Sequence, residues 1–228
     1  MSSLTGSFPP GSFLAKLPET SRAGLLALGT AREYPPGKVL LREGDPTSHA
    51  FVLVTGFVKV TATTPDGHLA LLAIRTAGEL IGELASMDGQ PRVATVTCAG
   101  RVRARLVTQP EFRRFLAAHP DVALAVGSSV GAKLRWATRR RVDFGSREVR
   151  IRLARVLLEL AAAHGTPGPA GAEIGVDLTQ PELAGLVGAA EPTVHRVLAG
   201  FRHAGIVATG YRRITVVDRA ELEAVADG

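Results

Sequence analysis

The stretch that most constrains this chain runs from Thr179 to His203 and reads TQPELAGLVGAAEPTVHRVLAGFRH. Apolar residues recur at helical spacing on both sides of Gly188, which predicts two short helices joined by a tight turn. Gly188 falls where a sharp bend needs a residue that tolerates positive φ. This pattern is typical of a DNA-binding helix-turn-helix, whose second helix enters the major groove. We therefore expect the rest of the chain to position this element, to bring two copies of it together and to control when it binds DNA.

Composition limits the classes of protein that the chain can form. It has 228 residues, 46% of them hydrophobic, enough for one large or two ordinary domains with their own cores. The single cysteine, Cys98, excludes a disulfide framework, a four-thiolate iron–sulfur centre and a cysteine zinc site within one chain. No apolar run reaches the roughly 18 residues of a membrane span, and the N-terminus lacks a signal-peptide pattern. We expect a cytoplasmic protein with no membrane partner and no obligatory cofactor.

The net charge of +6 is weak support for an anionic partner. Residues 147–228, which hold the predicted helix-turn-helix, contain nine basic and ten acidic residues and are not net basic. Residues 192–213, however, contain four arginines and no carboxylate. A locally positive face of this kind is what contact with DNA phosphates requires.

Short apolar runs separated by turn signals extend from residue 32 to about residue 108. They predict strands at residues 38–42, 49–54, 57–61, 69–74, 92–97 and 102–107. Pro65-Asp66-Gly67 predicts a hairpin turn. Many short strands at this spacing indicate a small barrel or roll. Residues 1–20 are rich in Ser, Pro and Gly and are expected to form a loose arm, and short helices are predicted at residues 21–30 and 110–119.

A long helix is predicted from Asp121 to about Phe144. Small or apolar residues fill most heptad a and d positions, at Ala123, Gly127, Val130, Leu134, Ala137, Arg141 and Phe144. This seam suits pairing with a second copy of the helix, or packing on the chain's own roll. Gly145-Ser146 is a candidate hinge. Beyond it we expect a helix at 147–164, a loop at 166–175, wing strands at 205–208 and 213–217 and a last helix at 219–226.

The order and spacing of these features resemble the CRP/FNR family of bacterial transcription regulators. The motifs are Tyr34-Pro-Pro-Gly37, Arg42-Glu-Gly-Asp45, Gly56-Phe-Val-Lys-Val60, Gly82-Glu-Leu84, Pro91-Arg92, the long helix and the helix-turn-helix. The resemblance implies an α+β fold with four parts. These are a flexible arm (1–20), a jelly-roll-like cyclic-nucleotide-binding β-roll (21–120), a dimerisation helix with a hinge (121–146) and a winged helix-turn-helix (147–228). It also implies a homodimer that binds a near-palindromic site in double-stranded DNA and works with RNA polymerase.

The segments 81–84 and 90–94 are similar to the phosphate-binding cassette of cyclic-nucleotide modules. A buried glutamate can accept from a ribose hydroxyl, and an arginine can make a forked contact with a phosphate. The expected ligand residues are Gly82, Glu83, Leu84, Arg92, Val93, Ala137 and Thr138. Val93 and Ala137 stand where the family usually has hydroxyl residues, which would weaken binding by roughly 0.5–1.5 kcal/mol per contact. Cyclic AMP is the leading ligand, another nucleotide or none is the alternative, and Glu83 and Arg92 could instead form a purely structural ion pair.

The second helix of the helix-turn-helix is expected to begin near Glu191. The expected DNA-binding residues are Thr179, Gln180, Glu191, Thr193, His195, Arg196, Arg202, Arg212 and Arg213. Arg196 is the leading candidate to read a guanine by a bidentate contact, and the family also has arginine at this position. Glu191-Pro192 departs from the Arg-Glu often found in the family, so we expect a different base preference where those residues read.

Two rival functions differ in class from a ligand-controlled regulator. One is a ligand-independent architectural DNA binder, against which the joint presence of Glu83 and Arg92 argues. The other is an enzyme regulated by a nucleotide. The sequence contains no nucleophile constellation, metal-ligand cluster or Walker motif that would support catalysis, so we expect a protein that is not an enzyme.

Overall fold

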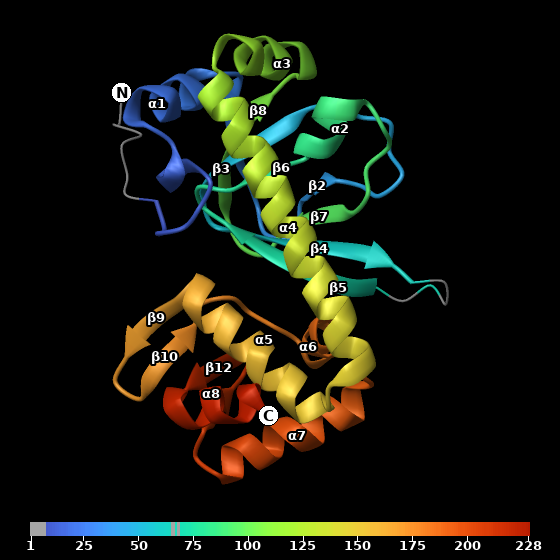
Figure 1. Ribbon diagram of the computed structural model, residues 1–228, viewed down its shortest axis with the longest axis vertical. Coiled ribbons are helices and arrows are strands. Elements are labelled where there is room, and N and C mark those ends of the chain that lie inside the picture. The colour runs from blue at the N-terminus through green and yellow to red at the C-terminus, as the bar shows by residue number, and fades with distance from the viewer. Residues whose placement is uncertain (1–7, 65–66, 68) are drawn as a thin grey trace. The chain divides into compact units, whose positions relative to one another are not determined.

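The computed structural model describes residues 8–64, 67 and 69–228 (Figure 1). The chain forms two compact units, one built on residues up to Ala62 with Ala73–Arg135, the other on Trp136–Gly228 with Thr63–Leu72. Each unit combines helices with antiparallel sheet, which confirms the predicted α+β class. The predicted hairpin turn at Pro65-Asp66-Gly67 lies outside the described residues, apart from Gly67.

The first unit is a β-roll made of two four-stranded sheets, with strand orders β1-β8-β3-β6 and β2-β7-β4-β5. The strands are β1 (Thr30–Tyr34), β2 (Val39–Leu41), β3 (Ala50–Thr55), β4 (Phe57–Thr63), β5 (Leu69–Thr76), β6 (Leu80–Ile81), β7 (Thr95–Cys98) and β8 (Val102–Val107). Side chains such as Phe51, Leu53 and Val58 are buried in its core. The sequence predicted the other strands of the roll, but not β1 or the two-residue β6.

The strand predicted at residues 92–97 begins only at Thr95. The backbone of Arg92 is used elsewhere, because its N–H donates to the carbonyl of Asp45 (3.0 Å) and its carbonyl accepts from the N–H of Gly44 (2.8 Å). Arg92 is therefore fixed to the turn at residues 44–45 before β7 starts.

The N-terminal segment packs on the roll. A 3₁₀ helix, η1 (Leu14–Lys16), leads to α1 (Glu19–Ala27). Phe13, Leu14 and Leu17 are buried in a cluster that includes side chains of α1 and α3 (Gln109–Ala118). The expectation of a loose arm is therefore wrong for residues 13–17, where apolar side chains between Ser, Pro and Gly supply core contacts.

The long helix α4 (Pro120–Ser146) confirms the predicted helix and extends through Gly145. One side is buried at Val122 and Val126, whereas Leu124 and Leu134 are 73% and 66% exposed. The predicted hinge residues lie in the last turn of this helix, and residues 147 and 148 separate them from α5. None of the helices in the described part of the chain has the length and apolar character needed to cross a membrane.

The second unit contains α5 (Val149–His164), α6 (Gln180–Val187), α7 (Glu191–His203) and α8 (Arg219–Asp227). Its sheet has the order β11-β12-β10-β9, from β9 (Gly165–Gly168), β10 (Gly171–Ile174), β11 (Val207–Gly210) and β12 (Arg213–Val216). The loop predicted at residues 166–175 is therefore wrong. Ala172 pairs with Val216, and Pro167 is tolerated because β9 is an edge strand with a partner on one side only.

Candidate ligand pocket and nucleic-acid interface

A cavity of about 150 Å³ lies in the roll and is lined by residues of both sheets and of α2 (Glu83–Asp88). Five expected ligand residues line it: Gly82, Glu83, Leu84, Arg92 and Val93. The cavity thus brings the two halves of the predicted cassette together. Ala137 and Thr138 are exposed on α4 and are not among its lining residues.

Gly82 precedes α2 in the left-handed conformation, with φ 76° and ψ 10°. A Cβ atom at this position would lie 2.7 Å from Nη1 of Arg92 and 3.0 Å from the carbonyl oxygen of His49. Glycine is therefore required both by the backbone conformation and by the close approach of the guanidinium. This is how the Gly82-Glu83 motif places Arg92 beside the start of α2.

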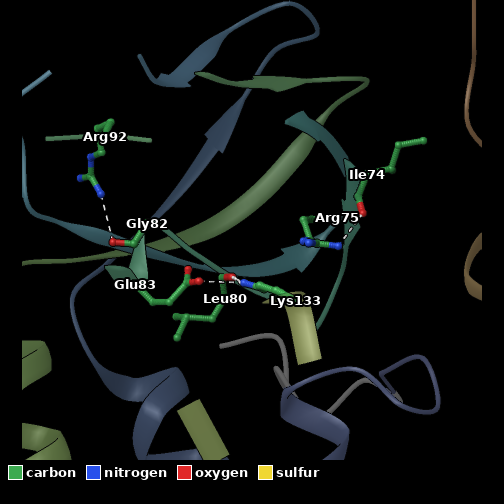
Figure 2. Close-up of polar contacts among 7 residues, drawn as sticks. All are labelled: Ile74, Arg75, Leu80, Gly82, Glu83, Arg92 and Lys133. Atoms are coloured by element: carbon green, nitrogen blue, oxygen red, sulfur yellow. Dashed lines mark hydrogen bonds and ion pairs between the residues drawn. The ribbon is translucent and has the colours of Figure 1, made fainter. Parts of the chain in front are cut away.

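Arg92 is 4% exposed, and its side-chain hydrogen bonds to the described residues all go to neutral acceptors. Nη1 donates to the carbonyl of Gly82 at 3.0 Å (Figure 2). Nη2 donates to the carbonyl of His49 (2.6 Å) and Nε to Oγ1 of Thr47 (3.1 Å). Burial lowers the pKa of Arg92, and the charge of Glu83 opposes this change. A guanidinium remains protonated in proteins, so its positive charge is present at the cavity wall.

Glu83 is also buried, but its ion-pair partner is Lys133 of α4 rather than Arg92. Nζ of Lys133 lies 3.0 Å from Oε1 of Glu83 and donates to the carbonyl of Leu80 at 2.9 Å (Figure 2). The alternative of a structural Glu83–Arg92 ion pair is therefore wrong. The sequence reasoning missed Lys133, although its position four residues before Ala137 places both on one side of the helix.

Arg75 is a second cavity residue that the sequence reasoning missed. It follows Leu71 and Ala73 in the alternation of β5, and both of these are buried. The sequence signal that could have identified Arg75 is its place two residues after Ala73, which puts a charged side chain on the same, inward face of the strand.

Trp136 lies on α4, directly before Ala137. Its Nε1 donates to Oε2 of Glu159 on α5 at 2.9 Å, and the guanidinium of Arg140 lies 4.5 Å from the ring centroid. These contacts are those of a packed side chain.

The helix-turn-helix is formed by α6 and α7. Thr179 caps α6, since its hydroxyl accepts from the N–H of Glu182 (3.4 Å) while the Glu182 carboxylate accepts from the N–H of Thr179 (2.8 Å). Gly188 ends the helix with φ 65°, as the sequence predicted. Gln180, expected to contact phosphate, lies half-buried in the first turn of α6.

The helix α7 has one buried and one exposed side. Val194, Leu198 and Phe201 are buried. Glu191, His195, Arg196 and Arg202 are exposed, and Thr193 is half-buried beside them. The structure therefore groups the side chains expected to read bases on the free side of the helix that begins at Glu191.

The wing carries the remaining predicted phosphate contacts. Arg212 adopts φ 55° in the turn between β11 and β12, next to the exposed Tyr211. Nε of Arg213 lies 3.4 Å from Oε1 of Glu173 on β10. Arg212 is thus presented at the wing tip, whereas Arg213 is partly neutralised by a neighbouring strand.

Comparison with known proteins supports both units. Residues 31–119 match the cyclic nucleotide-binding domain, and residues 151–225 match the Crp-like helix-turn-helix domain. A CRP-like cAMP-activated global transcriptional regulator from Mycobacterium tuberculosis is 30% identical over 190 residues, which cover 83% of this chain and 85% of that protein. The cAMP-activated global transcriptional regulator CRP of Salmonella typhimurium is 25% identical over 186 residues, covering 81% and 88%.

Among solved structures, a CRP/FNR-family transcriptional regulator from Thermus thermophilus is 25% identical with a TM-score of 0.70, covering 87% of this chain and 99% of that one. A cyclic nucleotide-binding roll followed by a long helix and a winged helix-turn-helix defines a one-chain transcription regulator. The chain belongs to the CRP/FNR family.

Proposed function

We propose that this protein is a cytoplasmic homodimer that binds a near-palindromic DNA site and regulates transcription with RNA polymerase under the control of a nucleotide. The observation that carries the proposal is the buried side chain of Arg92, which lines a cavity and whose acceptors among the described residues are all neutral. A buried charge with no counter-charge in direct contact is costly, and an anionic ligand lowers that cost. The protein is not an enzyme in this proposal.

Cyclic AMP is the leading nucleotide because two relatives of this chain are named for activation by it. Gly82, Glu83, Leu84, Arg92 and Val93 would contact the ligand, and Ala137 and Thr138 would approach its base from α4. We divide the chain into a sensor roll (21–120), a dimerisation helix with a hinge (121–146) and a DNA-binding domain (147–228).

Dimerisation is supported by the exposed side of α4. Gly127, Leu134 and Ala137 are exposed there, and they belong to the heptad seam. Exposed apolar side chains at regular helical spacing favour pairing with a second helix. Pairing would set the two α7 helices one DNA turn apart, about 34 Å. Ligand binding would then shift the population between two arrangements of the dimer.

The reading surface would comprise Glu191, Thr193, His195 and Arg196 for bases and Thr179, Gln180, Arg202, Arg212 and Arg213 for phosphates. Arg196→Ala should relax preference at one base position by about 1–3 kcal/mol. Arg219→Ala is the matched control, because Arg219 is exposed but ion-paired within α8. A uniform loss of affinity across all sequences after Arg196→Ala would make this residue a phosphate contact instead.

The test of nucleotide control is titration calorimetry with cyclic AMP and cyclic GMP, combined with DNA binding followed by fluorescence anisotropy. We expect heat of binding and a ligand-dependent rise in DNA affinity. Arg92→Lys should weaken nucleotide binding while keeping a cation in place, whereas Arg92→Ala would also remove three hydrogen bonds that hold the roll. Full DNA binding with no heat from either nucleotide would favour a ligand-independent DNA-binding or architectural protein.

A further inference from the structure

Arg75 lines the cavity, and in the described part of the chain no carboxylate forms an ion pair with its guanidinium. Among the described residues its hydrogen bonding consists of one long contact, from Nη1 to the carbonyl of Ile74 at 3.4 Å. No carboxylate oxygen of the described residues lies within 4.0 Å of the guanidinium nitrogens of Arg75. Burial lowers the pKa of Arg75, and the charges of Glu79 and Glu83 oppose this from a greater distance. An arginine has five N–H donors, so most of its capacity is available to a ligand.

The four charged side chains that line the cavity do not balance. Arg75, Arg92 and Lys133 are cations, and Glu83 is the anion. The Lys133–Glu83 ion pair is neutral as a unit, which leaves the charges of Arg75 and Arg92 among the lining residues. Glu79 and Asp45 act on these two arginines from outside the lining and form no ion pair with them. Figure 2 shows these two arginines on opposite sides of the pair. A cyclic mononucleotide has one phosphate with one negative charge and can neutralise only one of the two arginines.

We propose that Arg75 forms a second anion subsite, so that a nucleotide with two phosphate groups, one at Arg92 and one at Arg75, binds more tightly and is a stronger effector of this protein than cyclic AMP. This inference rests on the proposed nucleotide control of the roll. Arginine suits the role because its planar fork matches phosphate oxygens and it is more weakly hydrated than lysine. The Glu83–Lys133 pair between the two sites leaves the carboxylate able to accept a ribose hydroxyl.

A second phosphate accounts for Arg75 better than a nucleobase does. A guanidinium can read guanine through O6 and N7, but these are neutral acceptors and leave the charge in place. If the phosphate of a cyclic mononucleotide lies at Arg92, a base at Arg75 leaves the charge of the half-buried Arg75 uncompensated. Like charges in a low-dielectric cavity repel, and a two-phosphate ligand removes the repulsion as well as the desolvation cost.

The experiment measures the affinities of four probes by calorimetry at matched ionic strength. Cyclic AMP and cyclic GMP differ in base, whereas adenosine 3′,5′-bisphosphate and cyclic di-AMP each add a second phosphate to an adenine ligand. We expect at least one two-phosphate probe to bind about tenfold or more tighter than cyclic AMP, as a charge-assisted contact provides. Arg75→Gln should abolish that advantage and leave cyclic AMP affinity within about threefold, and Arg75→Lys should restore part of it.

Arg103→Gln is the matched control, because Arg103 is exposed on β8 and does not line the cavity. Like Arg75→Gln, it removes one positive charge from the roll, but two-phosphate probes should still bind it more tightly than cyclic AMP does. Equal affinity for one- and two-phosphate adenine probes would overturn the second subsite while leaving nucleotide control intact. A preference for cyclic GMP that disappears in Arg75→Gln would assign Arg75 to base reading and overturn the proposal. Absence of binding by all four probes would overturn the proposed nucleotide control itself.

Discussion

The helix α2 begins and ends at glycines with the same backbone conformation, which allows a sharp test of how the pocket is built. Gly82 has φ 76° and ψ 10°, and Gly89 has φ 76° and ψ 9°. A Cβ at Gly82 would lie 2.7 Å from Nη1 of Arg92 and 3.0 Å from the carbonyl oxygen of His49, whereas a Cβ at Gly89 would meet nothing within 4 Å. Alanine therefore imposes the same conformational cost at both positions and crowding at only one.

The left-handed conformation costs an alanine roughly 1–2 kcal/mol, so Gly89→Ala should lower the free energy of unfolding by about that amount. Overpacking adds about 1–3 kcal/mol, so Gly82→Ala should lose about 2–5 kcal/mol. In a chain of this size each kcal/mol corresponds to roughly 2–4 °C in melting temperature. The excess loss at Gly82 should be visible as several degrees.

Differential scanning calorimetry suits the comparison because the two units can unfold in separate transitions. We expect both variants to shift one transition, that of the roll, and Gly82→Ala to shift it further. Nucleotide titration provides a second measurement, since displacement of Arg92 should weaken binding in Gly82→Ala and not in Gly89→Ala. Equal shifts and equal nucleotide affinities would show that the approach of Arg92 to Gly82 does not determine the pocket.

Three other predictions concern single side chains. Thr179→Ala should cost the second unit about 1 kcal/mol through loss of the α6 capping box, and Thr179→Ser should not; equal urea unfolding of the two would refute the cap. Burial raises the pKa of Cys98 to about 11, so iodoacetamide should label it slowly at pH 8 in the folded protein and quickly in urea; fast labelling of the native state would contradict this. Burial also lowers the pKa of His49 below 6.5, helped by the charge of Arg92. The unfolded chain then binds the proton first as pH falls below 6.5, so the roll should lose stability there, and His49→Gln should flatten the dependence of melting temperature on pH between 7.5 and 5.5. An unchanged slope would show that His49 does not cause it.

The sequence predicted features that depend on neighbouring residues better than those that depend on distant ones. The turn glycine Gly188 and the apolar sides of α6 and α7 are local patterns, and the structure confirms them. The strands β9 and β10 were missed because Gly and Pro make up three of the four residues of β9, and because β10 pairs with β12, which comes some 40 residues later.

The pocket also combines features of neighbouring residues, which the sequence predicted, with features of distant residues, which it did not. Gly82 and Glu83 are adjacent in the sequence, and their motif located the cavity. Arg75 and Lys133 enter it from a strand and a helix more than 50 residues apart. No motif links them, so the charge balance of the cavity, and with it the second anion subsite, became apparent only in three dimensions.

The way in which Arg92 is held has a consequence for the order of folding. Its side chain is bonded to Thr47 and His49, which lie 45 and 43 residues earlier in the chain, and its backbone to the turn at residues 44–45. Contacts this far apart require closure of a long loop, which costs entropy before any contact compensates for it. We therefore expect the anion site to be among the last parts of the roll to form. A newly synthesised chain would then be unable to capture a nucleotide until the roll around residues 44–49 and 82–92 is complete.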